Sequence, residues 1–589
     1  MNRSTKTPDW HIFILSVLAL VALILDYGYP ENYWHHLVTD IYYIILGWAV
    51  LVFMKNTLRP PGYHKPVKRR GTYVVFGIVL ILAMISIVNT LLFVLFQNKD
   101  LNFITAMLVF LVAMFDLSSR LATLDRQTLH PALVFVISFL VLIFIGTLIL
   151  MLPNSTTNGI SFVDALFTST SAVCVTGLAV LDTSKDFSHV GQLAILFLIQ
   201  CGALGMLSFT SMFGLLFKGF GSYENRLNLK NLINAETLGN TFKTLIQILV
   251  FVVFVEVVGA ILIYYTVGDD FRFSDNRWFF SFFHSISAFC NAGFSTLSNS
   301  LYEESFRFNY SLHLVICVLI VLGGIGYGVI INLYQYSKRS VSYRIFRWFD
   351  LVLGNNNNNK IRPQLSLNTK IVLVTSLILI VFGAILFYVL EYDNTLKEHD
   401  AFGKIITALF GSITTRTAGF NTVNTGALTH SCIMIVMLLM WIGASPGSTG
   451  GGIKTTTFAV ATLNIFQQAF GFKSIRVGWK RIDQGALQRS TSIISLSLIV
   501  IGLSTFLLIT FDEHLGIMPI AFECFSAFST VGLSMGITGD LSVPSKIVII
   551  LTMFVGRVGL LTLLTGIARQ FYTYKYKPIQ YPEEKIFIN

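Results

Sequence analysis

The stretch Val175-Thr176-Gly177-Leu178 decides the fold, because three similar stretches follow it along the chain. These are Asn291-Ala292-Gly293-Phe294, Thr417-Ala418-Gly419-Phe420 and Thr530-Val531-Gly532-Leu533. Successive glycines are a little over one hundred residues apart each time. Four related units in one chain predict a pseudo-fourfold arrangement, in which four short glycine-containing segments meet on one axis. That geometry is typical of an ion pore.

The residues ahead of each glycine repeat as well. Ten residues before each glycine stand Phe167, Phe283, Leu409 and Phe522. Six residues before each glycine stand Ser171, Ser287, Ile413 and Ser526. The third copy therefore departs from the pattern at the second of these positions.

Composition indicates the environment of the chain. Of its 589 residues, 54% are hydrophobic and only 12% are charged, whereas soluble domains carry about 25% charged residues. Many apolar runs reach the length of roughly 20 residues that a helix needs to cross a bilayer. We therefore expect an all-α polytopic membrane protein.

The net charge of +11 also invites a nucleic-acid interpretation. The charges fall in clusters between apolar segments, with no aromatic residues among them, so we expect no nucleic-acid partner. Most of the 41 lysine and arginine residues lie in segments that a cytoplasmic N-terminus would place inside, as the positive-inside rule requires. The glycine segments then open from the outside.

The six cysteines lie in or beside apolar segments, and none forms a Cys-x-x-Cys pair. No histidine stands at ligand spacing, so neither a disulfide framework nor a zinc site is expected. Cys174 and Cys290 each stand three residues before a repeat glycine. They are therefore interpreted as equivalent positions of a repeat and not as a disulfide pair.

The apolar segments divide the chain into twelve expected spans. Four precede the repeats, near 11–25, 41–54, 73–97 and 101–119. Each unit then begins with a long apolar helix, near 131–152, 241–267, 369–391 and 490–511. Each unit ends with a second one, near 190–217, 311–334, 431–466 and 545–571. Between the two helices of a unit lies a re-entrant segment that ends at the repeat glycine.

These segments set the expected boundaries. Residues 1–128 form four extra N-terminal transmembrane helices, and the four repeats, each M1–pore helix–M2, occupy 129–235, 236–365, 366–485 and 486–589. The second repeat includes a run of five asparagines, Asn355 to Asn359, which is expected to be a flexible cytoplasmic connector.

The re-entrant segments are too short to cross a membrane as helices. A membrane admits non-helical backbone only where it is buried in protein or lines a water-filled cavity. A half-length helix entering from outside would point its carboxyl end, with its partial negative charge, toward a cation at the membrane centre. The strand that follows can turn its carbonyls inward to replace an ion's hydration shell. No acidic residue stands at the glycines, so selectivity by a ring of carboxylates is not expected.

Several longer motifs resemble those of the Trk/Ktr/HKT superfamily of potassium transporters over roughly residues 130–572. They are T-S-A-V-C-V-T-G-L (170–178), S-A-F-C-N-A-G-F (287–294), T-T-R-T-A-G-F-N-T (414–422), F-S-T-V-G-L (528–533), S-P-G-S-T-G-G-G-I-K-T-T (445–456) and G-R-V-G (556–559). The resemblance implies four M1–pore helix–M2 units with one filter glycine each. The first four helices exceed those of the commoner members.

The resemblance also implies the roles of named residues. The potassium selectivity filter would comprise Val175, Thr176, Gly177, Asn291, Ala292, Gly293, Thr417, Ala418, Gly419, Thr530, Val531 and Gly532. In some members a serine at the first filter position goes with sodium permeation, so four glycines imply a preference for potassium. An intramembrane gating loop below the filter would comprise Gly447, Ser448, Thr449, Gly450, Gly451, Gly452 and Lys454. Arg557 would be a positive barrier that ions must pass.

Each of these assignments has an alternative. The glycines and small residues of Ala444 to Thr457 disfavour a continuous helix, so the stretch is either a simple kink or the gating loop. It also mimics a phosphate-binding loop, but no strand precedes it, so an ATP site is not expected. Arg557 could instead form a structural ion pair with Glu256 or Glu523, because a charge at membrane depth usually faces a cavity or a partner. Glu256 is more readily explained as a buried counter-charge than as a proton carrier, and Arg416 is not expected in the ion path.

The predicted function is potassium uptake across the cell (inner) membrane, with potassium as substrate and no covalently bound cofactor. The alternatives are a sodium-permeable or sodium-coupled transporter and a polytopic membrane enzyme. An enzyme is not expected, because no H-E-x-x-H pattern occurs among the histidines. The distribution of lysine and arginine implies cytoplasmic termini, and the apolar spans imply contact with membrane lipid. The resemblance implies a homodimer with a cytoplasmic ring of nucleotide-binding regulatory subunits.

Overall fold

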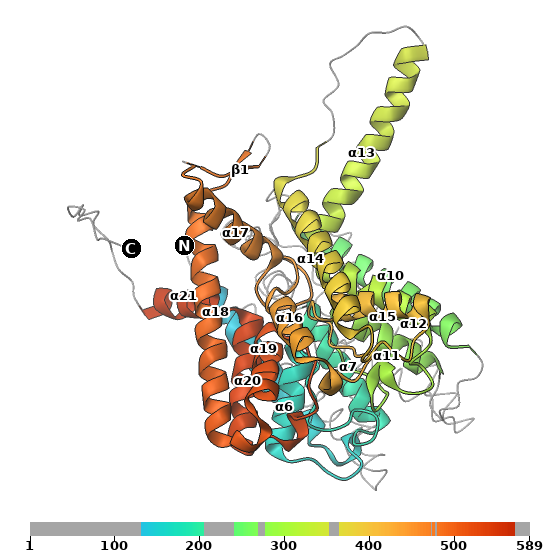
Figure 1. Ribbon diagram of the computed structural model, residues 1–589, viewed down its shortest axis with the longest axis vertical. Helices are drawn as coiled ribbons and strands as arrows, with labels where there is room; N and C mark the ends of the chain where they lie inside the picture. The colour runs from blue at the N-terminus through green and yellow to red at the C-terminus, as the bar shows by residue number, and fades with distance from the viewer. Residues whose placement is uncertain are drawn as a thin grey trace, which may run out of the picture.

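The computed structural model describes residues 131–204, 241–268, 277–352, 364–472, 474–477 and 480–571. This part of the chain is helical (Figure 1), and its only strands form a hairpin of β1 (Arg476–Val477) and β2 (Lys480–Arg481). The predicted all-α class is confirmed for these residues. The four predicted N-terminal helices and the asparagine tract lie outside them.

Each described unit begins with a long apolar helix. These are α5 (Pro131–Leu150), α10 (Thr241–Val267), α14 (Leu367–Glu391) and α18 (Gln484–Phe511). In the described part, three helices are long and apolar enough to cross a membrane: Gln247–Val267, Leu367–Glu391 and Gln484–Phe511. Large apolar side chains such as Phe254 and Leu377 are exposed on them, as expected of surfaces that face lipid.

A short, largely buried helix follows in each unit and ends just before the repeat glycine. These helices are α6 (Phe162–Val173), α11 (Arg277–Cys290), α15 (Ala401–Thr414) and α19 (Ile517–Ser529). Side-chain caps start two of them. Ser161 accepts the Asp164 N–H at α6, and Asp400 accepts the Gly403 N–H at α15, which satisfies backbone donors that a helix start leaves free.

Each of the first three short helices is fixed to its long neighbour by a buried hydroxyl. Ser169 donates to the Ile143 carbonyl at 2.7 Å, Ser285 donates to Glu256 O at 2.6 Å, and Ser412 donates to Ile380 O at 2.8 Å. The same contact recurs in these three units because the sequence around it repeats, whereas Cys524 stands at the equivalent position of the fourth unit.

The second helices of the units are more varied than the sequence predicted. They are α7 (His189–Leu204), α12 (Tyr310–Ile325) with α13 (Tyr327–Val352), α16 (His430–Trp441) with α17 (Thr455–Ala469), and α20 (Val543–Val558) with α21 (Leu560–Phe571). The interruption in the third unit was expected. The continuous helices predicted near 311–334 and 545–571 were wrong, because each is broken at a single glycine.

The break at Gly326 has a clear physical cause. Its φ is +90°, and a Cβ there would lie 2.7 Å from the Pro446 carbonyl of the third unit. The backbone at the break is packed against the loop that follows α16, because Tyr327 N–H donates to Gly447 O at 3.2 Å. The helices α12 and α13 meet there at 95°. Figure 1 shows α13 projecting beyond its neighbours. Gly559, with φ +83°, separates α20 from α21 in the same way.

Short 3-10 turns and polar contacts organise the outer loops. The turns are η1 (Pro153–Ser155), η5 (Ser300–Tyr302), η6 (Thr425–Ala427), η7 (Glu513–Leu515) and η8 (Thr538–Asp540). Lys546 at the start of α20 forms a 2.7 Å ion pair with Asp164 at the start of α6. This pair joins the fourth unit to the first.

Candidate ion pathway

The four short helices end in the same unusual backbone conformation. In each unit the residue two positions before the repeat glycine has a positive φ. These residues are Val175 (55°), Asn291 (60°), Thr417 (73°) and Thr530 (52°). Positive φ is uncommon for non-glycine residues and a true outlier for β-branched ones. Because it recurs at one position in all four units, the backbone turns in the same sense at the end of each short helix.

The four glycines then contact one another in cyclic order. All have positive φ: Gly177 (90°), Gly293 (72°), Gly419 (80°) and Gly532 (93°). A Cβ on Gly293 would lie 2.8 Å from the carbonyl oxygen of Ala418, the residue before the third glycine. The equivalent Cβ atoms on the other three glycines would lie under 3.0 Å from Ala292 O, Val531 O and Thr176 O. The structure therefore brings the twelve candidate filter residues together, each glycine against the next unit's backbone carbonyl.

Hydroxyl groups behind the strands fix this backbone. In the first and fourth units, Ser171 and Ser526 accept the N–H of Gly177 and Gly532, both at 3.1 Å. In the second unit, Ser287 donates instead to the Phe294 carbonyl at 2.7 Å.

The third unit departs from the repeat here, and the structure gives the reason. Thr414, not Ile413, supplies the hydroxyl, donating to Phe420 O at 2.6 Å. The chain between this hydroxyl and Gly419 is one residue shorter than in the other units. Counting back from the glycine therefore selects the wrong residue in this copy only.

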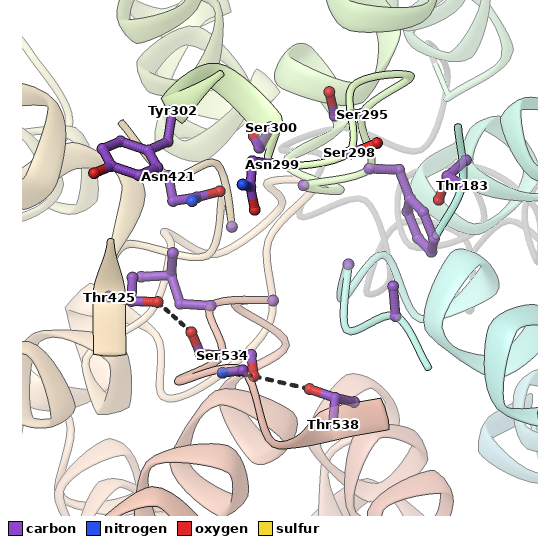
Figure 2. A pocket seen from close by; sticks show the side chains of 18 of the residues that line it. Thr183, Ser295, Ser298, Asn299, Ser300, Tyr302, Asn421, Thr425, Ser534 and Thr538 are labelled. Atoms are coloured by element: carbon purple, nitrogen blue, oxygen red, sulfur yellow. Dashed lines mark hydrogen bonds between the residues drawn. The ribbon is translucent and has the colours of Figure 1, made fainter. Parts of the chain in front are cut away.

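An open cavity of about 350 Å³ is lined by the four glycines and by the loops that follow them, on the side that the sequence predicts to face outward. Figure 2 shows segments of all four units around it. All four glycines line it, together with hydroxyl and amide side chains from the outer loops. Asp182 is the one acidic residue among its lining residues. Such a lining is open to hydrated cations and leads directly to the glycine backbone.

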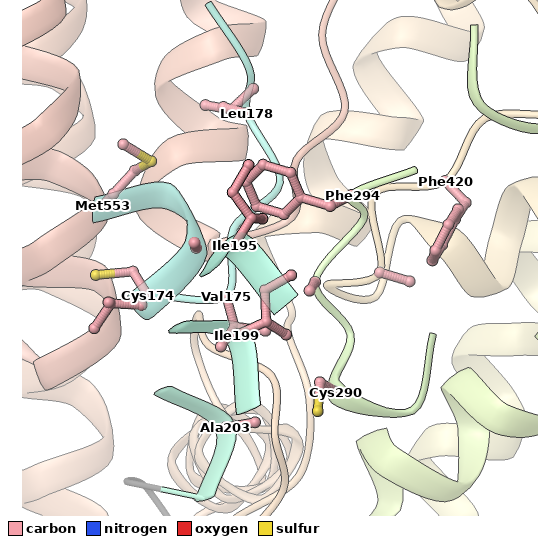
Figure 3. Close-up of a cluster of buried hydrophobic side chains, with 14 of the residues drawn as sticks. Cys174, Val175, Leu178, Ile195, Ile199, Ala203, Cys290, Phe294, Phe420 and Met553 are labelled. Carbon is pink, nitrogen blue, oxygen red and sulfur yellow. The ribbon is translucent and has the colours of Figure 1, made fainter. Parts of the chain in front are cut away.

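Buried apolar side chains support the first strand from behind. Figure 3 shows Val175 and Leu178 of this strand among Ile195 and Ile199 of α7. All four side chains are fully buried. Cys174 and Cys290 lie in the same cluster, and all six cysteines of the chain are free. Packing, without a covalent cross-link, therefore supports the strand.

The loop 442–454 between α16 and α17 lies on the inner side of the glycines. A Cβ on Gly450 would lie under 3.0 Å from the Thr417 hydroxyl, and one on Gly451 equally close to the Thr530 hydroxyl. The loop is also bonded to the second unit, because Ser445 N–H donates to Gly324 O at 3.0 Å and Thr449 Oγ1 donates to Phe289 O at 3.2 Å. It is therefore packed against the inner ends of the third and fourth strands.

Arg557 joins three units below the glycines. Its guanidinium donates to the carbonyl of Thr449 in the loop and, at 3.0 Å, to the carbonyl of Gly202 in α7. Arg557 is 1% exposed. The ion pair with Glu256 or Glu523, considered as an alternative, is not formed, because backbone carbonyls take the hydrogen bonds instead. Lys454 also turns to the loop and donates to Gly450 O at 2.5 Å.

The remaining candidate charges have other partners. Glu256 accepts from the Gln200 amide at 3.1 Å and the Cys290 thiol at 3.8 Å. Arg416 donates to the backbone and hydroxyl oxygens of Ser376 in α14, so its charge is directed at the first helix of its own unit. Two further polar residues, His284 and Glu523, were not predicted as site residues. Their common position nine residues before a glycine was the available signal.

These features are those of a helical, multi-pass membrane protein with a polar-lined cavity that reaches the four glycines. A family model described as cation transport protein, TrkH, matches residues 103–571. The chain belongs to this TrkH family of cation transport proteins.

Individual relatives agree with the family. The chain is 34% identical to the "Potassium/sodium uptake protein NtpJ" of Enterococcus hirae over 79% of its own length and 98% of that protein's. It is 34% identical to the "Ktr system potassium uptake protein B" of Bacillus subtilis over 78% of its own length and 96% of that protein's. These family members are named as transport proteins, which confirms the prediction of a transporter and not an enzyme.

The fold also has a solved counterpart. The crystal structure of the potassium transporter TrkH from Vibrio parahaemolyticus matches with a TM-score of 0.60, covering 84% of this chain and 97% of that one. The sequence identity is 18%, so this likeness concerns the fold alone.

Proposed function

We propose that this protein takes up potassium through a filter of backbone carbonyls formed by the four glycine strands. The observation that carries the proposal is the cyclic contact of Gly177, Gly293, Gly419 and Gly532, each against the carbonyl before the next glycine. Backbone carbonyls that surround an axis can replace the hydration shell of a potassium ion. The four short helices add the partial negative charge of their carboxyl ends.

The units are proposed to be pseudo-fourfold repeats with the boundaries expected from the sequence. The repeated positive φ two residues before each glycine supports this, because unrelated segments have no reason to share it. The outer cavity would face the outside of the cell and both termini the cytoplasm, as the distribution of lysine and arginine favours.

The loop 442–454 is proposed as the gate, with Arg557 as a positive barrier at its side. The loop lies directly inward of the third and fourth strands, so an ion leaving the filter meets it next. Arg557 holds the loop through the Thr449 carbonyl. A guanidinium at this depth repels a passing cation unless the loop and Arg557 move together.

A sodium-permeable or sodium-coupled transporter is the second candidate. The Enterococcus relative is named a potassium/sodium uptake protein, which favours it. Glycine at all four filter positions favours potassium. The homodimer, the regulatory nucleotide-binding ring and the location in the cell (inner) membrane remain proposals that rest on the family resemblance.

Uptake of rubidium into cells that lack their own potassium transporters tests the proposed function. We expect the protein to restore uptake and potassium to compete for it more strongly than sodium. Equal competition by the two ions would favour the sodium-permeable alternative. No uptake by well-expressed, folded protein would contradict the proposal.

A further inference from the structure

Two buried polar side chains have no part in the ion pathway described so far. His284 in α11 and Glu523 in α19 each stand nine residues before a glycine, Gly293 and Gly532. Both are fully buried. Burying a histidine or a carboxyl is unfavourable unless hydrogen bonds compensate, so their partners indicate what they do.

His284 is bonded at both ring nitrogens. Nδ1 lies 2.9 Å from the Phe280 carbonyl, and Nε2 lies 2.8 Å from the hydroxyl of Ser295. A carbonyl can only accept, so Nδ1 carries the proton and, in the neutral ring, Nε2 accepts from Ser295. Ser295 Oγ in turn accepts the Leu297 N–H at 3.0 Å. The ring thereby holds the chain two residues beyond Gly293.

Glu523 makes the same connection in the fourth unit. The Ser534 hydroxyl, two residues beyond Gly532, donates to Glu523 Oε1. Ser534 Oγ accepts the Gly536 N–H at 2.9 Å. Thr538 adds a second hydroxyl, 2.9 Å from the same carboxyl oxygen. An acceptor nine residues before the glycine, a serine two after it and an amide four after it are thus common to the second and fourth units.

The first and third units cannot form this connection. In the first, Thr168 stands at the helix position and Ala179 two residues after the glycine, so no hydroxyl is available there to donate. In the third, which is one residue shorter, Gly411 corresponds to the helix position and offers no side chain. Asn421 follows the third glycine by two residues and directs its amide to Val423 O at 3.5 Å.

The two connected strands are not neighbours in the cycle of glycines. Gly293 contacts the third unit and Gly532 contacts the first, so connected and unconnected strands alternate around the axis. Ser295 and Ser534 both line the outer cavity, where Figure 2 shows them on different sides of it. The outer ends of two strands are therefore bonded to buried groups, and the other two lack this bond.

We propose that His284 and Glu523 are positioning residues that set the potassium preference by holding the outer ends of the second and fourth strands. The proposal rests on the proposed filter function. With Ser295 and Ser534 fixed, the carbonyls before them resist drawing in around the smaller sodium ion. Without these bonds the two strands can move in around sodium, and the preference for potassium over sodium falls. A filter that selects by a fixed width needs its strands to be held in place.

The test uses the full-length protein in proteoliposomes, with the potassium-to-sodium permeability ratio as readout. Ser295→Ala and Ser534→Ala each remove one hydroxyl and leave the buried group in place. Each should lower the ratio by about fivefold, the equivalent of one hydrogen bond, and the double variant should lower it further. Glu523→Gln keeps an oxygen that can accept from Ser534, so its permeability ratio should equal that of the parent protein. Glu523→Leu has no such oxygen, and its ratio should fall.

Thr168→Val is the matched control, because it removes a buried hydroxyl from the same helix position of an unconnected unit. Its Oγ1 has no hydrogen-bond partner within the described residues, so the ratio should not change. If the serine variants match this control while the parent protein prefers potassium, the positioning proposal is overturned and the filter proposal stands. The positioning proposal is also overturned if the serine variants lose only thermal stability. If the parent shows no potassium preference, both proposals fail.

Discussion

The glycine strands and the second helices belong to the same four units, yet the units are alike in the first region and unlike in the second. At the glycines, every unit repeats a positive φ two residues before a positive-φ glycine. Further inward, single glycines break the second helices of the second and fourth units, whereas the loop 442–454 separates α16 from α17. An ion on the axis needs similar carbonyls from all sides, but an obstruction needs only one unit to differ. The similarity of the four glycine strands is thus suited to ion selectivity, and the difference among the second helices is suited to gating.

The largest effect on ion selectivity is expected from a substitution that makes one glycine strand unlike the other three. Gly177→Ser places a Cβ against the Ala292 carbonyl and a side chain at φ +90°, which costs about 1–3 kcal/mol of strain. The carbonyl must move, so the potassium-to-sodium permeability ratio should fall by about tenfold, the equivalent of 1.4 kcal/mol. Flux of both ions in proteoliposomes measures it.

Gly159→Ser is the control for backbone strain alone. Gly159 also has a positive φ of +78°, but nothing lies within 4 Å of the added Cβ. Its ratio should equal that of the parent protein. An unchanged ratio in Gly177→Ser would remove Gly177 from the filter.

The second effect concerns the loop 442–454, which is bonded to Arg557 of the fourth unit. Arg557→Ala removes the charge and both bonds, to Thr449 O and Gly202 O, and hydrogen bonds to charged groups contribute about 1.5–3 kcal/mol each. We expect the potassium flux per folded protein to rise by about tenfold for the lower figure. The potassium flux of Arg557→Lys, which keeps the charge, should rise less. A lower folded yield with unchanged flux per molecule would assign Arg557 a structural role only.

A smaller change in the same direction is expected from Thr449→Val. It removes the hydroxyl that bonds the loop to Phe289 O and nearly keeps the side-chain shape. One hydrogen bond of about 1 kcal/mol should raise the flux by about fivefold at most. Thr462→Val removes a comparable bond to Phe458 O inside α17 and should leave the flux unchanged. Equal effects of the two variants would speak against the loop as gate.

The smallest effect is expected at the join between the first and fourth units. Lys546→Gln removes the ion pair with Asp164, which is partly exposed to solvent. Such pairs contribute about 0.2–1 kcal/mol, so thermal unfolding in detergent should shift slightly and the permeability ratio not at all. Asp164→Asn alone and combined with Lys546→Gln completes a double-mutant cycle. A selectivity change in Lys546→Gln would mean that the outer join also shapes the filter.

The close approach of the four glycines could be expected from the sequence, because a backbone that approaches another backbone this closely leaves no room for a Cβ. The sequence could not predict the positive φ at Val175, Thr417 and Thr530, because β-branched residues disfavour that region. The end of the short helix and the packing of four strands impose it. The spacing of the repeat selects Ile413, whereas Thr414 supplies the hydroxyl. This difference was not predicted, because the one-residue shortening of the third unit is visible only in the structure.

The inner region was predicted less completely. A glycine-rich loop such as 442–454 is recognisable, but a single glycine inside an apolar run is compatible with a continuous helix. The breaks at Gly326 and Gly559 therefore needed the structure. Sequence also carries no signal for backbone carbonyls as partners of a buried charge. The alternative considered for Arg557, an ion pair with Glu256 or Glu523, therefore named partners that it does not contact.

The position of bound ions tests the central claim most directly. Crystals of the protein soaked with rubidium or thallium, both potassium substitutes, would locate the ion by anomalous diffraction. We predict anomalous peaks on the axis between Gly177, Gly293, Gly419 and Gly532, which weaken when sodium replaces potassium and its substitutes. Peaks confined to other parts of the molecule, with none between the four glycines, would contradict the account.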